Sequence, residues 1–110
     1  MENQFKRVTE AEEFSELVQL SQQQPVVIFK HSTSCGVSSA AYDEMEHFDG
    51  EVMLVEVQRA RELSREIERR TGIRHETPQV LVLKNGNVVW NASHWKVKAH
   101  AVTDAVRSAE

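Results

Sequence analysis

The sequence has little cysteine, proline or aromatic side chain. Its 110 residues include one cysteine and two prolines, and aromatic residues make up 6%. A single cysteine excludes an internal disulfide and a metal site built from several cysteines of one chain. No apolar run is long enough to cross a membrane, and the first residues lack the apolar stretch of a signal peptide. We therefore expect no membrane association and a cytoplasmic, reducing location, where a lone thiol persists.

Charge gives no indication of a nucleic-acid partner. The formal net charge is −4, and the basic residues are interspersed with acidic ones. Hydrophobic residues make up 40% of the chain and charged residues 27%, which is typical of a folded globular protein. The length predicts a single domain over residues 1–110, with enough chain to bury a core.

Hydrophobic periodicity predicts strands and helices in alternation. Strands are expected at 25–29, 52–57, 80–84 and 87–90. Helices are expected after Thr9 to about Gln23, after Cys35 to about Phe48, from Arg59 to Arg70, and from about Val97 to Ser108. Thr9 and Glu12 have the spacing of a capping box, and Gly72 is placed to end the third helix.

The order of these elements predicts an α/β fold. A strand, helix and strand around Cys35 form a crossover, which requires a parallel pair. Asn85-Gly86 between two apolar runs is a strong signal for a hairpin, which adds an antiparallel pair. We expect a mixed sheet of about four strands with helices on both faces.

Cys35 lies where the first of these strands gives way to a helix. The N–H groups at a helix start carry partial positive charge, which favours the thiolate form of a cysteine. Lys30 and His31 are close in sequence and are candidate sources of further positive potential. The alternatives are a buried, inert cysteine and a structural histidine, but the polar run Ser32–Ser34 favours exposure of the thiol.

Four segments together resemble one family. They are Phe29–Thr33, Cys35 with Ser38, His75–Gln79 and Ala92–Trp95, and the resemblance covers most of the chain. The chain resembles the single-thiol bacilliredoxins, which have a thioredoxin-like fold. In the usual motif of that family Pro-Ile stands between the cysteine and the serine, whereas this sequence has Gly36-Val37.

The resemblance implies an enzyme, a thiol–disulfide oxidoreductase. Cys35 would be the catalytic nucleophile that removes bacillithiol from mixed disulfides with proteins. Bacillithiol would be a co-substrate, with no permanently bound cofactor and no metal. The implied partners are bacillithiolated client proteins, together with bacillithiol or a disulfide reductase that regenerates the enzyme.

Bacillithiol carries carboxylates, so hydrogen-bond donors near Cys35 are candidate contacts. Pro78 is expected to be cis from the resemblance, with the Thr77 backbone turned toward the ligand. The expected substrate-binding residues are Ser34, Gly36, Val37, Ser38, Thr77 and Pro78. Ser38 has the alternative of an ordinary first-turn residue, and Pro78 that of a proline opening a strand.

Two other functions stay open. The Cys-Gly-x-Ser motif also resembles the monothiol glutaredoxins, which bridge an iron–sulfur cluster between two chains with glutathione. Those proteins carry a Gly-Gly pair after the hairpin, where this sequence has Asn91-Ala92-Ser93. A thioredoxin-fold domain that binds partner proteins without turnover is the second alternative.

Overall fold

A five-stranded mixed sheet forms the centre of the molecule. The computed structural model describes residues 4–110. The strand order is β1-β3-β2-β4-β5; β1, β3 and β2 run parallel, and β4 and β5 are antiparallel to their neighbours. The strands are β1 (Phe5–Arg7), β2 (Val26–His31), β3 (Val52–Glu56), β4 (Gln79–Lys84) and β5 (Asn87–Ser93). The thioredoxin-like α/β arrangement expected from the sequence is thus present, with one more strand.

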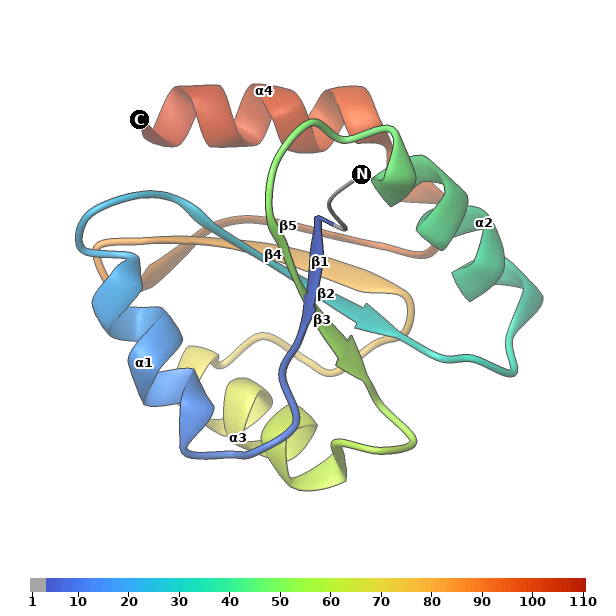
Figure 1. The fold of residues 1–110 in the computed structure, drawn as a ribbon, viewed down its shortest axis with the longest axis horizontal. Coiled ribbons are helices and arrows are strands. Elements are labelled where there is room, and N and C mark those ends of the chain that lie inside the picture. The colour runs from blue at the N-terminus through green and yellow to red at the C-terminus, as the bar shows by residue number, and fades with distance from the viewer. Residues whose placement is uncertain (1–3) are drawn as a thin grey trace.

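Helices cover both faces of the sheet (Figure 1). The helices are α1 (Glu13–Leu20), α2 (Gly36–Glu46), α3 (Arg61–Thr71) and α4 (Ala99–Ala109), with a 3-10 turn η1 (His94–Lys96) before α4. Helices α1 and α3 lie on one face, and α2 and α4 lie on the other. None of the helices within residues 4–110 combines the length and apolarity needed to span a bilayer.

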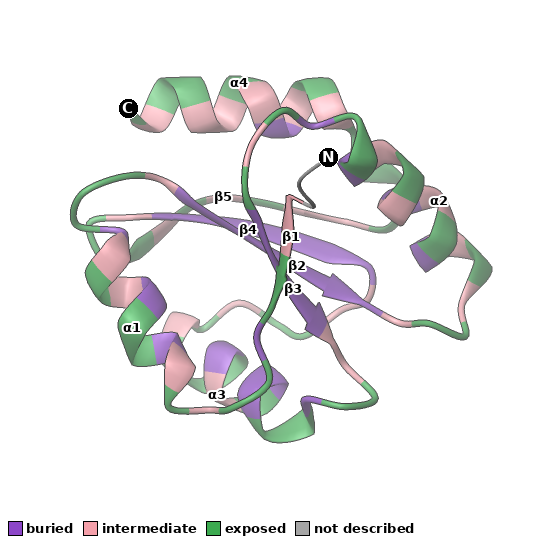
Figure 2. Cartoon of the chain, in the orientation of Figure 1, coloured by how far each residue is buried: buried purple, intermediate pink, exposed green. Residues whose placement is uncertain are grey.

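The side chains of the central strands alternate between two apolar cores. In β2, Ile28 packs in the core beneath α1 and α3, whereas Phe29 packs in the core beneath α2 and α4. Leu63 of α3 and Met45 of α2 are fully buried in these two cores. Figure 2 shows the central strands buried along most of their length, as expected for strands covered on both faces.

The first strand was not expected from the sequence. β1 has only three residues and pairs in parallel with β3, so that Phe5 lies opposite Val52 and Arg7 opposite Leu54. Lys6 and Arg7 are exposed, and their side chains form ion pairs with Glu51 and Glu56 at 3.2 and 3.1 Å. A three-residue strand with two charged residues carries no recognisable alternation, so only the backbone pairing reveals it.

The start of α1 differs from the predicted capping box. The helix begins at Glu13 rather than just after Thr9, and it ends at Leu20 rather than near Gln23. The Glu13 carboxylate accepts hydrogen bonds from the backbone N–H groups of Thr9 and Glu10, at 3.2 and 3.0 Å. The carboxylate that caps the start of the helix therefore belongs to Glu13 and not to Glu12. The turn between Thr9 and the helix is longer than in a capping box.

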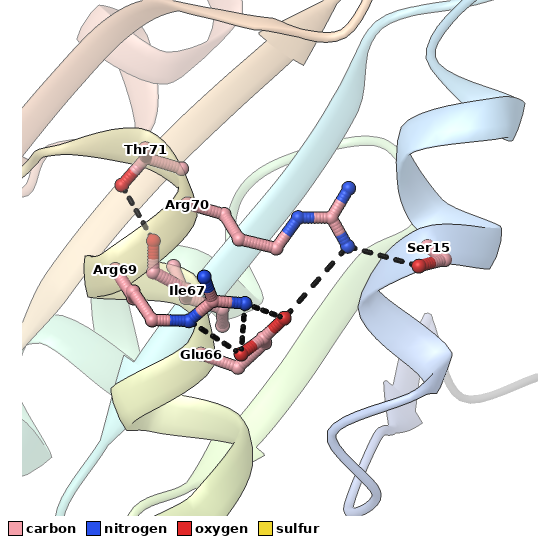
Figure 3. Close-up of polar contacts among 6 residues, drawn as sticks. All are labelled: Ser15, Glu66, Ile67, Arg69, Arg70 and Thr71. Carbon is pink, nitrogen blue, oxygen red and sulfur yellow. Dashed lines mark hydrogen bonds and ion pairs between the residues drawn. The ribbon is translucent and has the colours of Figure 1, made fainter.

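Helices α1 and α3 are joined by polar contacts as well as by the core. The Arg70 guanidinium donates to the Ser15 hydroxyl at 2.9 Å and lies over the Phe14 ring, 5.0 Å from its centroid. Figure 3 shows the neighbouring pairs, in which Glu66 binds Arg69 at 2.8 Å and Arg70 at 3.9 Å. The charged face of α3 is thus partly a contact with α1.

The hairpin turn forms as its sequence predicts. Asn85 and Gly86 both have positive φ, 53° and 79°, which a two-residue hairpin turn of this kind requires. The strand that follows is longer than expected and reaches Ser93, with a register irregularity opposite Val82 and Leu83. This extension and the 3-10 turn delay the start of the last helix to Ala99.

Replacement of Gly72 by alanine tests the end of α3. Gly72 has φ 73°, and an added Cβ there meets no atom within 4 Å, so only the left-handed backbone opposes a side chain. We expect Gly72→Ala to lower the free energy of unfolding by about 1 kcal/mol. Gly36→Ala is the matched control: its Cβ also meets nothing within 4 Å, but its φ is not positive, so urea unfolding should show no loss of stability.

Candidate active site

Cys35 is the N-cap residue of α2. Its backbone is extended, with φ −117° and ψ 128°, and the helix begins at the next residue. The side chain is partly exposed and the thiol is free. The Cys35 carbonyl accepts a hydrogen bond from the Ser39 N–H at 3.0 Å, which fixes Cys35 to the first turn of the helix. The N–H groups of Gly36 and Val37 have no partner inside the helix at this end. Cys35 therefore lies at the start of a helix and is partly exposed.

Ser38 holds the loop that leads to Cys35. It is fully buried, and its hydroxyl accepts the Ser32 N–H at 2.9 Å and shares a hydrogen bond with His31 Nδ1 at 2.8 Å. Within residues 4–110 no hydrogen bond joins this hydroxyl to the Cys35 sulfur. Ser38 was expected to contact the ligand or the thiolate. The structure instead gives its hydroxyl a positioning role, which neither that expectation nor the plain first-turn reading described.

His31 is a buried residue beside the Cys35 loop. It is 8% exposed, and its ring packs against Tyr42, with ring centroids 5.0 Å apart. Burial lowers the pKa of His31 below its usual value, and this outweighs the opposing effects of Glu56 and of the hydrogen bond with Ser38. The sequence suggested His31 as a source of positive potential at Cys35. Burial weakens that source, because it disfavours the charged ring.

Gln58 closes the loop from the other side. Its side-chain amide donates to the hydroxyls of Ser32 and Ser34, at 2.8 and 3.1 Å, and accepts the Thr33 N–H at 3.3 Å. Gln58 follows β3 and is distant from the loop in sequence, so the sequence analysis did not single it out. Ser34, a predicted ligand contact, is exposed and has its hydroxyl bonded to this amide.

Lys30 lies on the opposite face of β2 from His31. It is fully buried, and its Nζ is 3.1 Å from His75 Nδ1. Burial lowers the pKa of Lys30 to about 8, although the Glu68 carboxylate acts in the opposite direction. Burial and the Lys30 charge together lower the pKa of His75, whose backbone N–H donates to Glu68 at 2.8 Å. The Lys30 side chain is thus bonded to His75 and is not free to contact a ligand.

The Thr77–Pro78 segment lies at the same end of the sheet as Cys35. Gln79 at the start of β4 pairs with Lys30 near the end of β2, so the residues before Gln79 lie beside the loop after His31. The peptide bond between Thr77 and Pro78 is cis. The Pro78 carbonyl accepts the His94 N–H at 2.9 Å, which places η1 next to it, and Trp95 of η1 is 64% exposed. Thr77 makes no hydrogen bond within residues 4–110 and is partly exposed.

Comparison with known proteins decides the family. The family model of the monothiol bacilliredoxin BrxC matches residues 6–102. The chain belongs to the monothiol bacilliredoxin family. A thiol redox function follows from this membership and from the free cysteine at the helix start.

Solved structures support the fold of this bacilliredoxin. A protein with a thioredoxin fold superposes with a TM-score of 0.83 at 28% identity, covering 92% of each chain. Thioredoxin f from spinach chloroplast in its short form gives a TM-score of 0.69 at 23% identity, covering 99% of this chain and 98% of that one. The thioredoxin pre-protein of Schistosoma mansoni gives 0.70 at 18% identity, covering 98% and 100%.

Five of the predicted site residues form two groups in this bacilliredoxin, and Ser34 lies in the loop held by Gln58. Cys35, Gly36 and Val37 lie together at the helix start, and Thr77 and Pro78 precede the neighbouring strand at the same sheet end. Ser38 is buried behind the loop. Gln58 and the contact between Lys30 and His75 were missed, because they join segments that are far apart in the sequence.

Replacement of Ser38 by alanine tests its positioning role. The change leaves the Ser32 N–H and His31 Nδ1 without their partner in a buried place. We expect Ser38→Ala to lower the free energy of unfolding by about 1–3 kcal/mol. Ser39→Ala is the control, because this neighbour is exposed and its hydroxyl only reaches the Cys35 carbonyl at 3.4 Å. Equal urea unfolding curves for the two variants would contradict the role.

The pH dependence of stability tests the burial of Lys30. Because its pKa is lowered to about 8 from 10.5, the unfolded chain holds more protons than the folded one between these values, and stability should rise with pH in that window. We expect the free energy of unfolding, relative to Lys30→Met, to increase by about 3 kcal/mol from pH 8 to pH 10.5. Both proteins should carry Cys35→Ser so that the thiol does not titrate. If the free energy of unfolding changed with pH in the same way in both proteins, Lys30 would be hydrated and the prediction would be wrong.

Proposed function

We propose that this protein is a monothiol disulfide oxidoreductase that removes bacillithiol from mixed disulfides with proteins. The observation that carries the proposal is the placement of Cys35, the only cysteine, as a partly exposed N-cap residue in a chain of the monothiol bacilliredoxin family. A helix start favours the thiolate, which is the attacking species in thiol–disulfide exchange.

The reaction proceeds by two exchanges at sulfur. The Cys35 thiolate attacks the bacillithiol sulfur of the mixed disulfide, the old S–S bond breaks, and the client protein leaves as a thiolate that takes up a proton. Bacillithiol is then held on Cys35 by a new disulfide. A second thiolate, from free bacillithiol or from a disulfide reductase, attacks that bond and releases Cys35. No net oxidant is needed, because each step exchanges one thiolate for another.

The second step requires an external thiol in this protein. Ser38 stands where a dithiol enzyme would carry its resolving cysteine, and a hydroxyl cannot resolve a disulfide. Ser38 is also buried and bonded to His31 and Ser32. Free bacillithiol as co-substrate, or a reductase partner, therefore completes the cycle, as expected for an enzyme working in the reducing cytoplasm.

Ligand contacts in this proposal come from both sides of the sulfur. The unpartnered N–H groups of Gly36 and Val37 face an incoming carboxylate or sulfur anion. The backbone N–H and C=O of Thr77 can pair with an extended ligand or client segment, as in the addition of a short β-strand. Pro78 packs beside Thr77. The Ser34 hydroxyl, held by Gln58, is available as an acceptor or donor at the rim.

Release of bacillithiol from a modified client tests the proposal. A single-cysteine client carrying bacillithiol should be reduced by catalytic amounts of the protein when reduced bacillithiol is supplied, and Cys35→Ser should leave only the uncatalysed rate. When reduced bacillithiol is left out, intact mass after the first exchange should show bacillithiol on Cys35. Wild-type protein alkylated at Cys35 is the matched control, since its fold and all other side chains are unchanged.

Two outcomes would contradict the proposal. Full activity of Cys35→Ser would show that the sulfur is not the nucleophile and would favour a binding module. Visible absorbance from an iron–sulfur cluster after anaerobic isolation, without exchange activity, would favour the monothiol glutaredoxin alternative.

A further inference from the structure

A cavity of about 420 Å3 lies along α3, between that helix and the segments that enter and leave it. It is lined by Val57 and by residues with polar or charged groups, namely Gln58, Arg61, Ser64, Arg65, Glu68 and His75. The volume falls within the range of small-molecule sites, about 300–1,000 Å3. We propose that this cavity binds the carboxylate end of the small thiol that reacts at Cys35. The inference rests on the proposed exchange reaction and adds the residues that select its substrate.

The cavity adjoins the loop that carries the reactive residue. Gln58 forms part of its wall, and the same side chain holds Ser32, Thr33 and Ser34 through three hydrogen bonds. A molecule in the cavity therefore lies against the residue that fixes the segment immediately before Cys35. In the proposal, a small thiol anchored in the cavity extends past Gln58 toward the loop.

Two arginines supply the charge that a carboxylate needs. Arg61 and Arg65 are one turn apart on α3, and both line the cavity. Arg61 forms no ion pair within residues 4–110, and Arg65 meets only Glu62, at 3.4 Å, with both side chains more than 70% exposed. An exposed pair of this kind contributes little and is readily exchanged. Guanidinium groups match the two oxygens of a carboxylate.

Arg69 and Arg70, further along the same helix, are engaged elsewhere. They bind Glu66, and Arg70 also donates to Ser15 of α1 (Figure 3). Neither lines the cavity. Glu66 thus occupies Arg69 and Arg70, and Arg70 also contacts α1, whereas Arg61 and Arg65 lie at the cavity.

Ser64 is a buried polar residue of the cavity wall. It lies between the two arginines in sequence and is 6% exposed. Its hydroxyl has no hydrogen-bond partner in the part of the chain that the structure describes, and the oxygen itself is almost inaccessible. Ser64 therefore supports the wall between the two arginines, and the charge that an anion would meet comes from Arg61 and Arg65.

The acidic residue of the cavity lies furthest from Arg61. Glu68 follows Arg61 by roughly two turns of the helix, but follows Arg65 by less than one turn. Its carboxylate already accepts the His75 N–H at 2.8 Å and lies in the field of Lys30. The end of the cavity at Arg61 is therefore its most basic part, and it is the end next to Gln58 in sequence.

Exchange with two disulfides tests the proposal. Bacillithiol disulfide is anionic and hydroxyethyl disulfide is neutral, and both can add to Cys35. We expect the ratio of their second-order rate constants, read from intact mass, to fall about tenfold in Arg61→Gln/Arg65→Gln. Arg69→Gln/Arg107→Gln is the matched control, since it removes the same charge from exposed arginines outside the cavity. There the ratio should equal that of the wild type. Equal falls in both double variants, or no fall in either, would overturn the proposal.

A binding measurement separates this proposal from the exchange reaction itself. Reduced bacillithiol added to Cys35→Ser should shift the amide resonances of Gln58 and Ser64, and Arg61→Gln/Arg65→Gln should abolish the shifts. If wild-type protein exchanges with neither disulfide but these shifts appear, the proposed function fails and the cavity assignment stands. If exchange proceeds but the shifts are absent, the cavity assignment fails alone.

Discussion

The position of the reactive sulfur depends on how one short loop is held. The loop Ser32–Ser34 connects β2 to Cys35, and it is bonded on one side by the buried Ser38 hydroxyl and on the other by the Gln58 amide. Each clamp bonds to the backbone or to hydroxyls of the loop, so the backbone entering Cys35 has few ways to move. Such preorganisation matters for exchange, because three sulfurs must align in the transition state and a loop already in place need not be ordered then.

The end of β2 separates two basic side chains by simple alternation. Lys30 points to the face of α3 and meets His75, whereas His31 points to the face of α2 and meets Ser38. Both are desolvated, and in both the pKa is lowered. Burial therefore disfavours the charged form of both side chains, and the Lys30 ammonium is turned toward His75. The N–H groups of the helix start lie directly beside Cys35 and favour an anion there, and the cavity arginines supply charge further along the ligand.

The sequence alone was sufficient to predict the features that depend on a local pattern of residues. Apolar periodicity placed the four longer strands and the helices, Asn85-Gly86 fixed the hairpin, and Cys35 was correctly placed before a helix. β1 was missed because three residues hold no period, and the cap of α1 was misassigned because the turn between Thr9 and the helix is longer than the motif assumes. The contacts of Gln58 depend on tertiary proximity, which one sequence does not reveal.

Gly36 replaces the proline of the usual family motif, although the fold does not require glycine at this position. Cys35 already has the extended backbone that a residue before proline adopts, and a Cβ at Gly36 meets nothing within 4 Å. Proline is also well suited to the first position of a helix. The fold would therefore accept the proline that the family usually carries. Glycine keeps an N–H group at that position, where the helix supplies no acceptor, directly beside the sulfur. The chain thus has one more donor for a thiolate or a ligand oxygen, in exchange for a less constrained helix start.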